Sequence, residues 1–143
     1  MIVIDANVLI DALFEGNPER RELALQFFRL IEGRSVYVPR IFIVEVLSVA
    51  RRLGVRLDYR TLMGLIEDFN IKTEDELFNL AVYVSENIHP RAVDAYYIAT
   101  AILTGGILVS NDKTMIKNSR NASIEAFYLL EEFEKLEEYL SSR

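Results

Sequence analysis

Two acidic residues each follow closely on a short, fully apolar stretch of the chain. Asp5 comes directly after residues 2–4, and Asp112 comes shortly after residues 107–109. Apolar, β-branched runs without polar alternation are typical of strands buried on both faces of a parallel sheet. Carboxylates at the carboxyl ends of such strands lie at the edge where open α/β sheets bind ligands. For Asp5 alone, capping of the helix that follows is an equally good interpretation.

Two further acids lie on predicted helices and are expected to face inward. The spacing places Glu45 on a helix over residues 40–53 and Asp94 in the first turn of a helix over residues 90–105. A buried carboxylate is costly unless it is paired or bound to a metal, although a first-turn aspartate also complements the helix dipole. The other members of the two inward stripes are Ile41, Val44 and Ser48 for Glu45, and Ile98 and Ala101 for Asp94.

These four carboxylates would meet at one sheet edge if the strands of Asp5 and Asp112 are neighbours. At ~5 Å and an effective dielectric constant of about 20, each ionised pair repels by ~3 kcal/mol. Either some of the carboxyls are then protonated, or divalent cations neutralise them. Because the chain has no cysteine and no suitably placed histidine, its oxygen ligands favour Mg²⁺ or Mn²⁺. Such a site is suited to phosphodiester hydrolysis.

Other familiar catalytic equipment is missing from the sequence. There is no glycine-rich phosphate loop and no Ser-His-Asp arrangement. The only histidine, His89, directly precedes Pro90, and we interpret it as a turn residue rather than a general base. The acids therefore remain the only candidates for chemistry.

The elements that must position these acids alternate between strand and helix along the chain. Such alternation predicts parallel strands joined by right-handed crossovers, that is, a three-layer α/β/α fold. The length suits a single domain over residues 1–143 with one core. Helix starts are indicated by Asn17, by Asp58 and by a capping box from Thr73 to Glu76. The expected strands cover residues 2–4, 35–38, 70–72, 107–110 and 124–128.

The composition excludes several classes of protein. A hydrophobic content of 51% with 27% charged residues is typical of a globular chain rather than a disordered one. The lack of cysteine excludes disulfides and thiolate metal sites, and it suits a reducing cytoplasm. The longest uncharged stretch, residues 95–111, contains two glycines and is too short to span a membrane. We therefore expect a cytoplasmic protein with no membrane partner and no signal peptide.

For the question of a nucleic-acid partner, the distribution of charge along the sequence is more informative than the net charge. The net charge of −6 argues against a nucleic-acid partner, but residues 125–143 alone contain six glutamates. Residues 34–60 contain six arginines against two acids, a modest basic surface that is compatible with RNA. A solvated helix face is the more frequent meaning of such a run. The weak candidates for RNA contact are Arg40, Arg51 and Arg52.

Four segments of the chain resemble the signature segments of the PIN domain, a family of metal-dependent ribonucleases. They stand in the family's order and spacing and span nearly the whole sequence. The resemblance implies a parallel sheet of strand order 3-2-1-4-5 and an RNA endonuclease that depends on Mg²⁺ or Mn²⁺. The segments are IVIDANVLI, PRIFIVEVLSVA, AVDAYYIATA and ILVSNDKTM.

The same resemblance implies the site residues and the partners. Asn7 and Ser110 match the polar positions that accompany the acids in the family, with serine in place of the usual threonine. A PIN domain of this size is similar to VapC-type toxins, which implies a homodimer held inactive by an antitoxin. Two alternatives stay open: an RNA-processing nuclease that is not a toxin, and a PIN fold that binds RNA or assembles without cutting. The family's acidic quartet falls on Asp5, Glu45, Asp94 and Asp112.

Overall fold

The computed structural model describes residues 1–143 and contains one sheet of five parallel strands. The strands are β1 (Ile2–Ile4), β2 (Val36–Pro39), β3 (Asn70–Lys72), β4 (Ile107–Ser110) and β5 (Ala126–Tyr128). Their order in the sheet is β3-β2-β1-β4-β5, so β1 and β4 are neighbours as the convergence of the acids requires. The predicted fold class and the strand order 3-2-1-4-5 are both confirmed.

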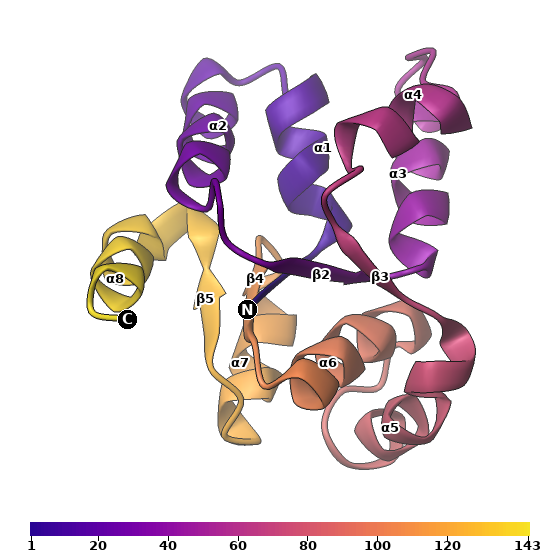
Figure 1. Ribbon diagram of the computed structural model, residues 1–143, viewed down its shortest axis with the longest axis vertical. Coiled ribbons are helices and arrows are strands. Elements are labelled where there is room, and N and C mark those ends of the chain that lie inside the picture. The colour runs from indigo at the N-terminus through magenta and orange to yellow at the C-terminus, as the bar shows by residue number, and fades with distance from the viewer.

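Helices cover both faces of the sheet and make the other two layers. They are α1 (Ala6–Phe14), α2 (Pro18–Leu30), α3 (Ile41–Arg52), α4 (Tyr59–Leu65), α5 (Glu74–Asn87), α6 (Ala92–Thr104), α7 (Lys113–Asn121) and α8 (Leu129–Ser141). In Figure 1 the helices α1 to α4 lie above the sheet and α5 to α7 lie below it, while α8 returns to pack beside α2. No helix is both long and apolar enough to cross a membrane.

The helices begin where the sequence indicates. Asn17 accepts hydrogen bonds from two backbone N–H groups at the start of α2, and Asp58 accepts one from Thr61 at the start of α4. Thr73 and Glu76 form both hydrogen bonds of the predicted capping box at the start of α5. Each cap satisfies amides that have no partner inside the helix, which fixes the point where the helix starts.

Two adjacent glycines bring the chain from α6 into the centre of the sheet. Gly105 ends α6 with a left-handed φ of 69°, a conformation that costs a side-chain-bearing residue about 1 kcal/mol or more. At Gly106 a Cβ atom would lie only 2.8 Å from the carbonyl oxygen of Met1. The lack of a side chain there allows β4 to start directly beside β1.

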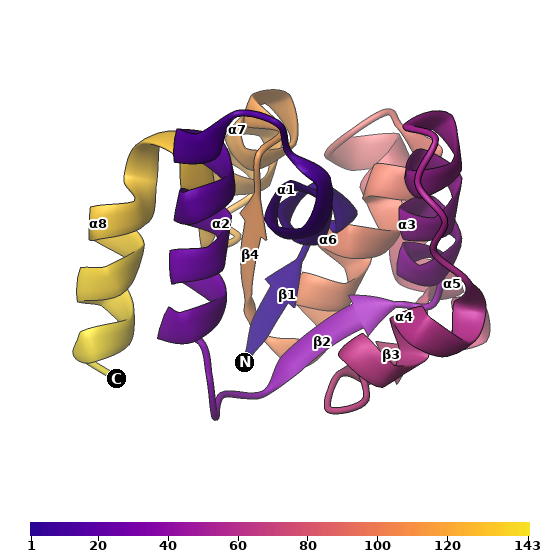
Figure 2. The same ribbon diagram turned by 90° about the horizontal axis from the view of Figure 1, so that it is seen from above.

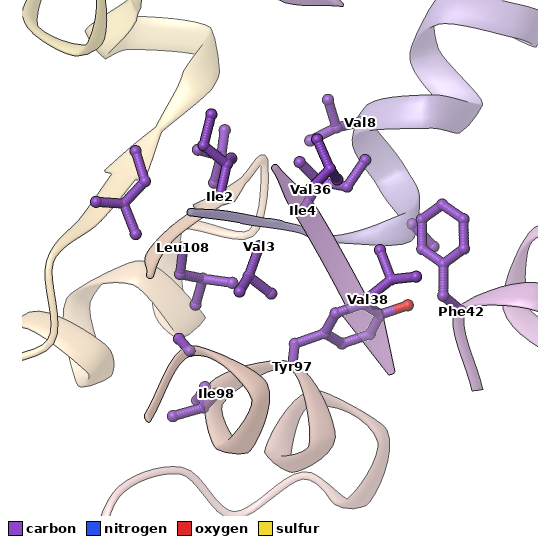
Figure 3. Packing of buried hydrophobic residues seen from close by; sticks show 14 of the residues in the cluster. Ile2, Val3, Ile4, Val8, Val36, Val38, Phe42, Tyr97, Ile98 and Leu108 are labelled. Atoms are coloured by element: carbon purple, nitrogen blue, oxygen red, sulfur yellow. The ribbon is translucent and has the colours of Figure 1, made fainter. Parts of the chain in front are cut away.

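The core is built around β1, whose three residues are all fully buried. In Figure 3, Ile2 and Ile4 point to the side of Val8 on α1, whereas Val3 points with Leu108 toward α6. This strand is buried on both faces because helices cover both faces of the sheet. Burial of apolar surface on two sides holds the end of β1 in place, and with it the acid that follows.

The carboxyl ends of the central strands form the edge that carries the candidate site. Figure 2 shows β1 and β4 side by side and pointing the same way, toward the start of α1 and toward α7. The amide of Asp5 continues the pairing by donating to the carbonyl of Val109 at 3.0 Å. The residues that follow these two strands are therefore held next to each other by backbone hydrogen bonds.

Candidate active site

Asp5 stands between β1 and α1, at the N-cap position of the helix. Its side chain makes no capping hydrogen bond. Instead, Asp5 Oδ2 accepts a hydrogen bond from Ser110 Oγ at 2.7 Å. Asp5 is 6% exposed, and no cationic side chain pairs with its carboxylate. The capping interpretation of Asp5 is therefore wrong, and this buried acid has no compensating cation.

Ser110 connects the two acids that follow the central strands. While its hydroxyl donates to Asp5, its oxygen accepts a hydrogen bond from the backbone N–H of Asp112 at 2.8 Å. Asp112 in turn caps α7, because its Oδ1 accepts from the backbone N–H of Met115 at 3.1 Å. Asp112 thus combines a structural role with a position beside Asp5.

Glu45 lies in the second turn of α3 and is half-buried. Its Oε1 accepts a hydrogen bond of 2.5 Å from the hydroxyl of Tyr97, a fully buried side chain of α6. Burial raises the pKa of Glu45, and the nearby Asp94 raises it further, while Tyr97 and Arg52 act in the opposite direction. Glu45 is therefore held in place by a neighbour but is not neutralised.

The predicted inward stripe of α3 is wrong. Val44 is 57% exposed, Ser48 is exposed, and Glu45 lies at the margin of the buried face. Several faces of α3 are apolar, so helical spacing alone does not select the buried one. Phe42 selects it by packing against Phe69, with ring centroids 6.1 Å apart. The buried residues of α3 are Phe42, Ile43, Val46 and Ala50.

Asp94 lies in the first turn of α6 with most of its side chain covered. Its Oδ2 is 2.8 Å from Nε2 of His89 and 4.0 Å from Nε of the exposed Arg91. His89 lies in the connection between α5 and α6, as predicted, but it also contacts two side chains. Its ring is buried, and its Nδ1 lies 2.8 Å from the side-chain nitrogen of Asn118.

The other three acids of the quartet act electrostatically on Asp5. Burial raises the pKa of Asp5 to about 7 from 3.8, against the hydrogen bond from Ser110, and Glu45, Asp94 and Asp112 add to the rise. Asp5 therefore lies within the electrostatic influence of the other three acids. The largest rise in pKa falls on Asp5, the most deeply buried of the four acids.

The donor set suits a hard divalent cation that keeps part of its water shell. No three histidine, aspartate or glutamate side chains lie close enough to form a closed metal cage. Mg²⁺, however, is usually held by one or two carboxylates together with water and substrate phosphates. The buried, uncompensated Asp5 carboxyl could supply one such ligand, and the charges of three further carboxylates act on it. The residues present therefore fit Mg²⁺ or Mn²⁺.

The PIN domain family model matches residues 2–121, which is most of the chain. The chain belongs to the PIN domain family. The resemblance of the four segments is thereby confirmed, and PIN domains are in general nucleases that use divalent metal ions. No curated protein sequence matches this one.

Solved structures share the fold of this PIN domain at low sequence identity. FitAcB from Neisseria gonorrhoeae is 18% identical with a TM-score of 0.66, over 91% of this chain and 99% of that one. A toxin–antitoxin complex from Klebsiella pneumoniae is 25% identical with a TM-score of 0.62, over 80% and 89%. PAE2754 from Pyrobaculum aerophilum is 20% identical with a TM-score of 0.58, over 99% and 90%.

Asn7 and Asn111 hold the loop that carries Asp112 in this PIN domain. Asn7 Oδ1 accepts from the backbone N–H of Asn111 at 3.2 Å. The side chain of Asn111 donates to the buried Asp11 at 2.8 Å and accepts from the backbone of α8. Arg20 pairs with Asp11 at 2.8 Å, so this second buried acid is compensated, unlike Asp5. Sequence reasoning gave Asn111 no role.

The three arginines proposed for RNA contact have different surroundings. Arg40 precedes α3 and is paired with Glu74 at 2.5 Å. Arg51 lines a small hollow between α3 and α4, away from the acids. Arg52 lies two turns beyond Glu45 on the same side of α3 and lowers the pKa of that glutamate. Of the three arginines, Arg52 is the one whose charge acts on an acid of the quartet.

The largest cavity of the PIN domain is not at this edge. It has a volume of about 800 Å³ and is lined in part by Gly105 and Gly106, which precede β4, and by Ile124 and Glu125, which precede β5. None of the four acids lines it. The candidate site therefore lies outside this cavity.

Proposed function

We propose that residues 1–143 form a single catalytic unit, a cytoplasmic endoribonuclease that depends on Mg²⁺ or Mn²⁺. Its proposed metal ligands and catalytic groups are Asp5, Glu45, Asp94 and Asp112. The observation that carries the proposal is the buried carboxyl of Asp5, whose pKa is raised to about 7 beside three other acids. Perturbed carboxyls of this kind are a mark of functional sites, and a bound cation would remove the repulsion.

The residues of the site would bind the metal, hold the metal ligands in place and contact the substrate. These carboxylates would hold a divalent cation, which would supply a water of lowered pKa as the nucleophile toward a phosphodiester. Ser110 holds Asp5 and the amide of Asp112 at a fixed separation, and Tyr97 holds Glu45. Arg52, an exposed cation on the Glu45 side of α3, is placed to contact a backbone phosphate of the substrate.

RNA cleavage with matched variants tests the proposal. The wild-type protein is expected to cut single-stranded RNA with Mg²⁺ or Mn²⁺ and to stop when EDTA is added. Asp5→Asn and Asp94→Asn should lose at least ~100-fold in rate because each removes a ligand charge. Asp75→Asn, which changes an exposed acid in the first turn of α5 that is not part of the quartet, should cut at the wild-type rate.

Two outcomes would oppose the proposal. Undiminished cleavage by both folded site variants would place the chemistry elsewhere. Binding of RNA by the metal-loaded protein with no cutting of any RNA tried would favour the alternative, an RNA-binding or assembly module that does not turn over.

We further propose that this nuclease is the toxin of a toxin–antitoxin pair and works as a homodimer. The support is the similarity to a toxin–antitoxin complex at 25% identity. Exposed apolar side chains of α3 and α5, such as Val44, Phe78 and Val82, give a second copy a surface to cover. Growth arrest on expression, relieved by the product of an adjacent gene, is the expected result. A monomer in light scattering, with no effect on growth, would oppose both parts.

A further inference from the structure

His89 is the one histidine of the chain, and its ring is buried next to a proposed metal ligand. Only 2% of the residue is exposed, in the connection between α5 and α6. Both ring nitrogens are within hydrogen-bond distance of a side chain, with Asp94 Oδ2 at 2.8 Å from Nε2 and Asn118 at 2.8 Å from Nδ1. A buried ring that is bonded at both nitrogens has a fixed position and a fixed orientation.

The partners determine which nitrogen carries the proton. The carboxylate of Asp94 can only accept, so Nε2 of His89 donates to it. The amide nitrogen of Asn118 donates to Nδ1, so the ring N–H directed at Asp94 is that of Nε2. The hydrogen bonds Asn118–His89–Asp94 thus connect α7, through the α5–α6 connection, to the first turn of α6.

This contact engages only one of the two carboxylate oxygens. Both the hydrogen bond from His89 and the distant approach of Arg91 involve Oδ2 of Asp94. Oδ1 has no hydrogen-bond partner on the protein. A ligating carboxylate whose second oxygen is hydrogen-bonded presents the first in a defined direction and loses less conformational freedom when a cation binds.

We propose that His89 is a positioning residue, which holds Asp94 through Oδ2 so that Oδ1 points to the divalent cation, and that Asn118 fixes the tautomer of His89 for this task. This inference rests on the proposed function, because it assumes that Asp94 is a metal ligand. The inference assigns His89 to orienting Asp94 rather than to proton transfer, because the Nε2–H of His89 is already engaged in a hydrogen bond to Asp94.

Calorimetric titration with Mn²⁺ tests the inference without relying on cleavage. His89→Leu keeps the ring's bulk in the core but removes both hydrogen bonds, and it should weaken Mn²⁺ binding by about 10- to 100-fold. His89→Gln offers an amide N–H near the position of Nε2 and should recover most of the affinity. Asn118→Leu should give a smaller loss in the same direction. RNA cleavage by His89→Leu should be restored toward the wild-type kcat by raising the Mn²⁺ concentration.

Asn87→Ala is the matched control. Asn87 is exposed two residues before His89 and bonds only to a carbonyl of its own helix, so this variant should bind Mn²⁺ like the wild type. Circular dichroism shows whether each variant is folded, and Asn118→Leu tests the same chain of contacts if His89→Leu does not fold.

The outcomes separate the two proposals. If the wild type binds no Mn²⁺, or if Asp94→Asn binds it as well as the wild type, the proposed function fails. If Asp94→Asn loses Mn²⁺ binding while folded His89→Leu and Asn118→Leu bind as the wild type does, only the positioning role is overturned. Equal losses in His89→Leu and His89→Gln would also overturn it, because a hydrogen bond to Asp94 would then not be what matters.

Discussion

Asp5 differs from the other buried acid of this chain in having no compensating cation. Asp11 is paired with Arg20 and bonded to Asn111, whereas the strongest contact of Asp5 is a single serine hydroxyl. The pKa of Asp5 therefore rises to about 7, mainly because burial disfavours its charged form. In the absence of a cation, ionising this residue works against folding.

Replacing Asp5 by asparagine should change how stability depends on pH. Between pH 3.8 and 7 the folded wild type holds a proton on Asp5 that the unfolded chain releases, so its stability falls as the pH rises through this range. Asp5→Asn lacks this loss. In EDTA, its stability relative to the wild type should increase by about 2–3 kcal/mol from pH 5 to pH 8. Urea unfolding of both proteins at the two pH values is the measurement.

A stability difference that stays constant with pH would show that Asp5 ionises as easily in the folded chain as in the unfolded one. That result would remove the observation on which the proposed function depends. The direct comparison with Asp5→Asn cancels the contribution of Asp11, whose pKa burial also raises.

For single residues, positions within an element could be predicted from the sequence, but side-chain contacts between elements could not. The sequence predicted that Asp5 and Asp112 follow buried strands, because strand ends follow from apolar runs, while the family resemblance implied that these strands are neighbours. It did not predict that Tyr97 holds Glu45 or that His89 holds Asp94, since these contacts join different elements. A weak signal existed for both: Tyr97 is three residues after Asp94 on the same helix face, and His89 stands just before the start of that helix.

At the scale of elements, Asp112 is both a helix cap and a proposed ligand, and two substitutions separate these roles. Asp112→Asn keeps an oxygen for the N–H of Met115, so its stability should lie within about 0.5 kcal/mol of the wild type. Asp112→Ala removes the cap and should cost about 1 kcal/mol. Both should lose RNA cleavage, because both lack the charge. Thermal unfolding and a cleavage assay, run on the same samples, are the measurements.

The comparison of the two variants decides between the roles. Cleavage by Asp112→Asn at the wild-type rate would make Asp112 a cap and nothing more. The control is Asp58→Asn, an equivalent exchange at the cap of α4, where neither stability nor cleavage should change appreciably.

Element boundaries were predictable where a cap or a glycine marks them, and element faces were less so. The capping box at Thr73 and the glycine after α6 set real helix ends. The inward face of α3 was assigned wrongly, because this helix is apolar on several sides and only its packing against Phe69 decides which side is buried. Periodicity determines a face only when the opposite face is polar.

At the scale of the whole molecule, the candidate site draws its acids from β1, α3, α6 and the start of α7. The alternation of strands and helices predicted the layers, but the strand order 3-2-1-4-5 came from the family resemblance, because alternation alone allows other orders. A cation bound to these acids would join segments that are separated by most of the chain. Its binding energy should therefore add to the stability of the entire fold and not to that of one segment.

This coupling predicts a melting temperature that depends on both Mn²⁺ and pH. At a Mn²⁺ concentration of about 100 times the dissociation constant at pH 8, the gain should be about 2.7 kcal/mol, or about 8 °C. At pH 5.5 and the same Mn²⁺ concentration, most of Asp5 is protonated, and the cation must displace that proton. The gain should then fall to about 1 kcal/mol. Asp94→Asn should show little gain at either pH, and Asp75→Asn should match the wild type. Equal gains at the two pH values would mean that the cation binds without Asp5, and the absence of any gain would mean that these four carboxylates hold no metal.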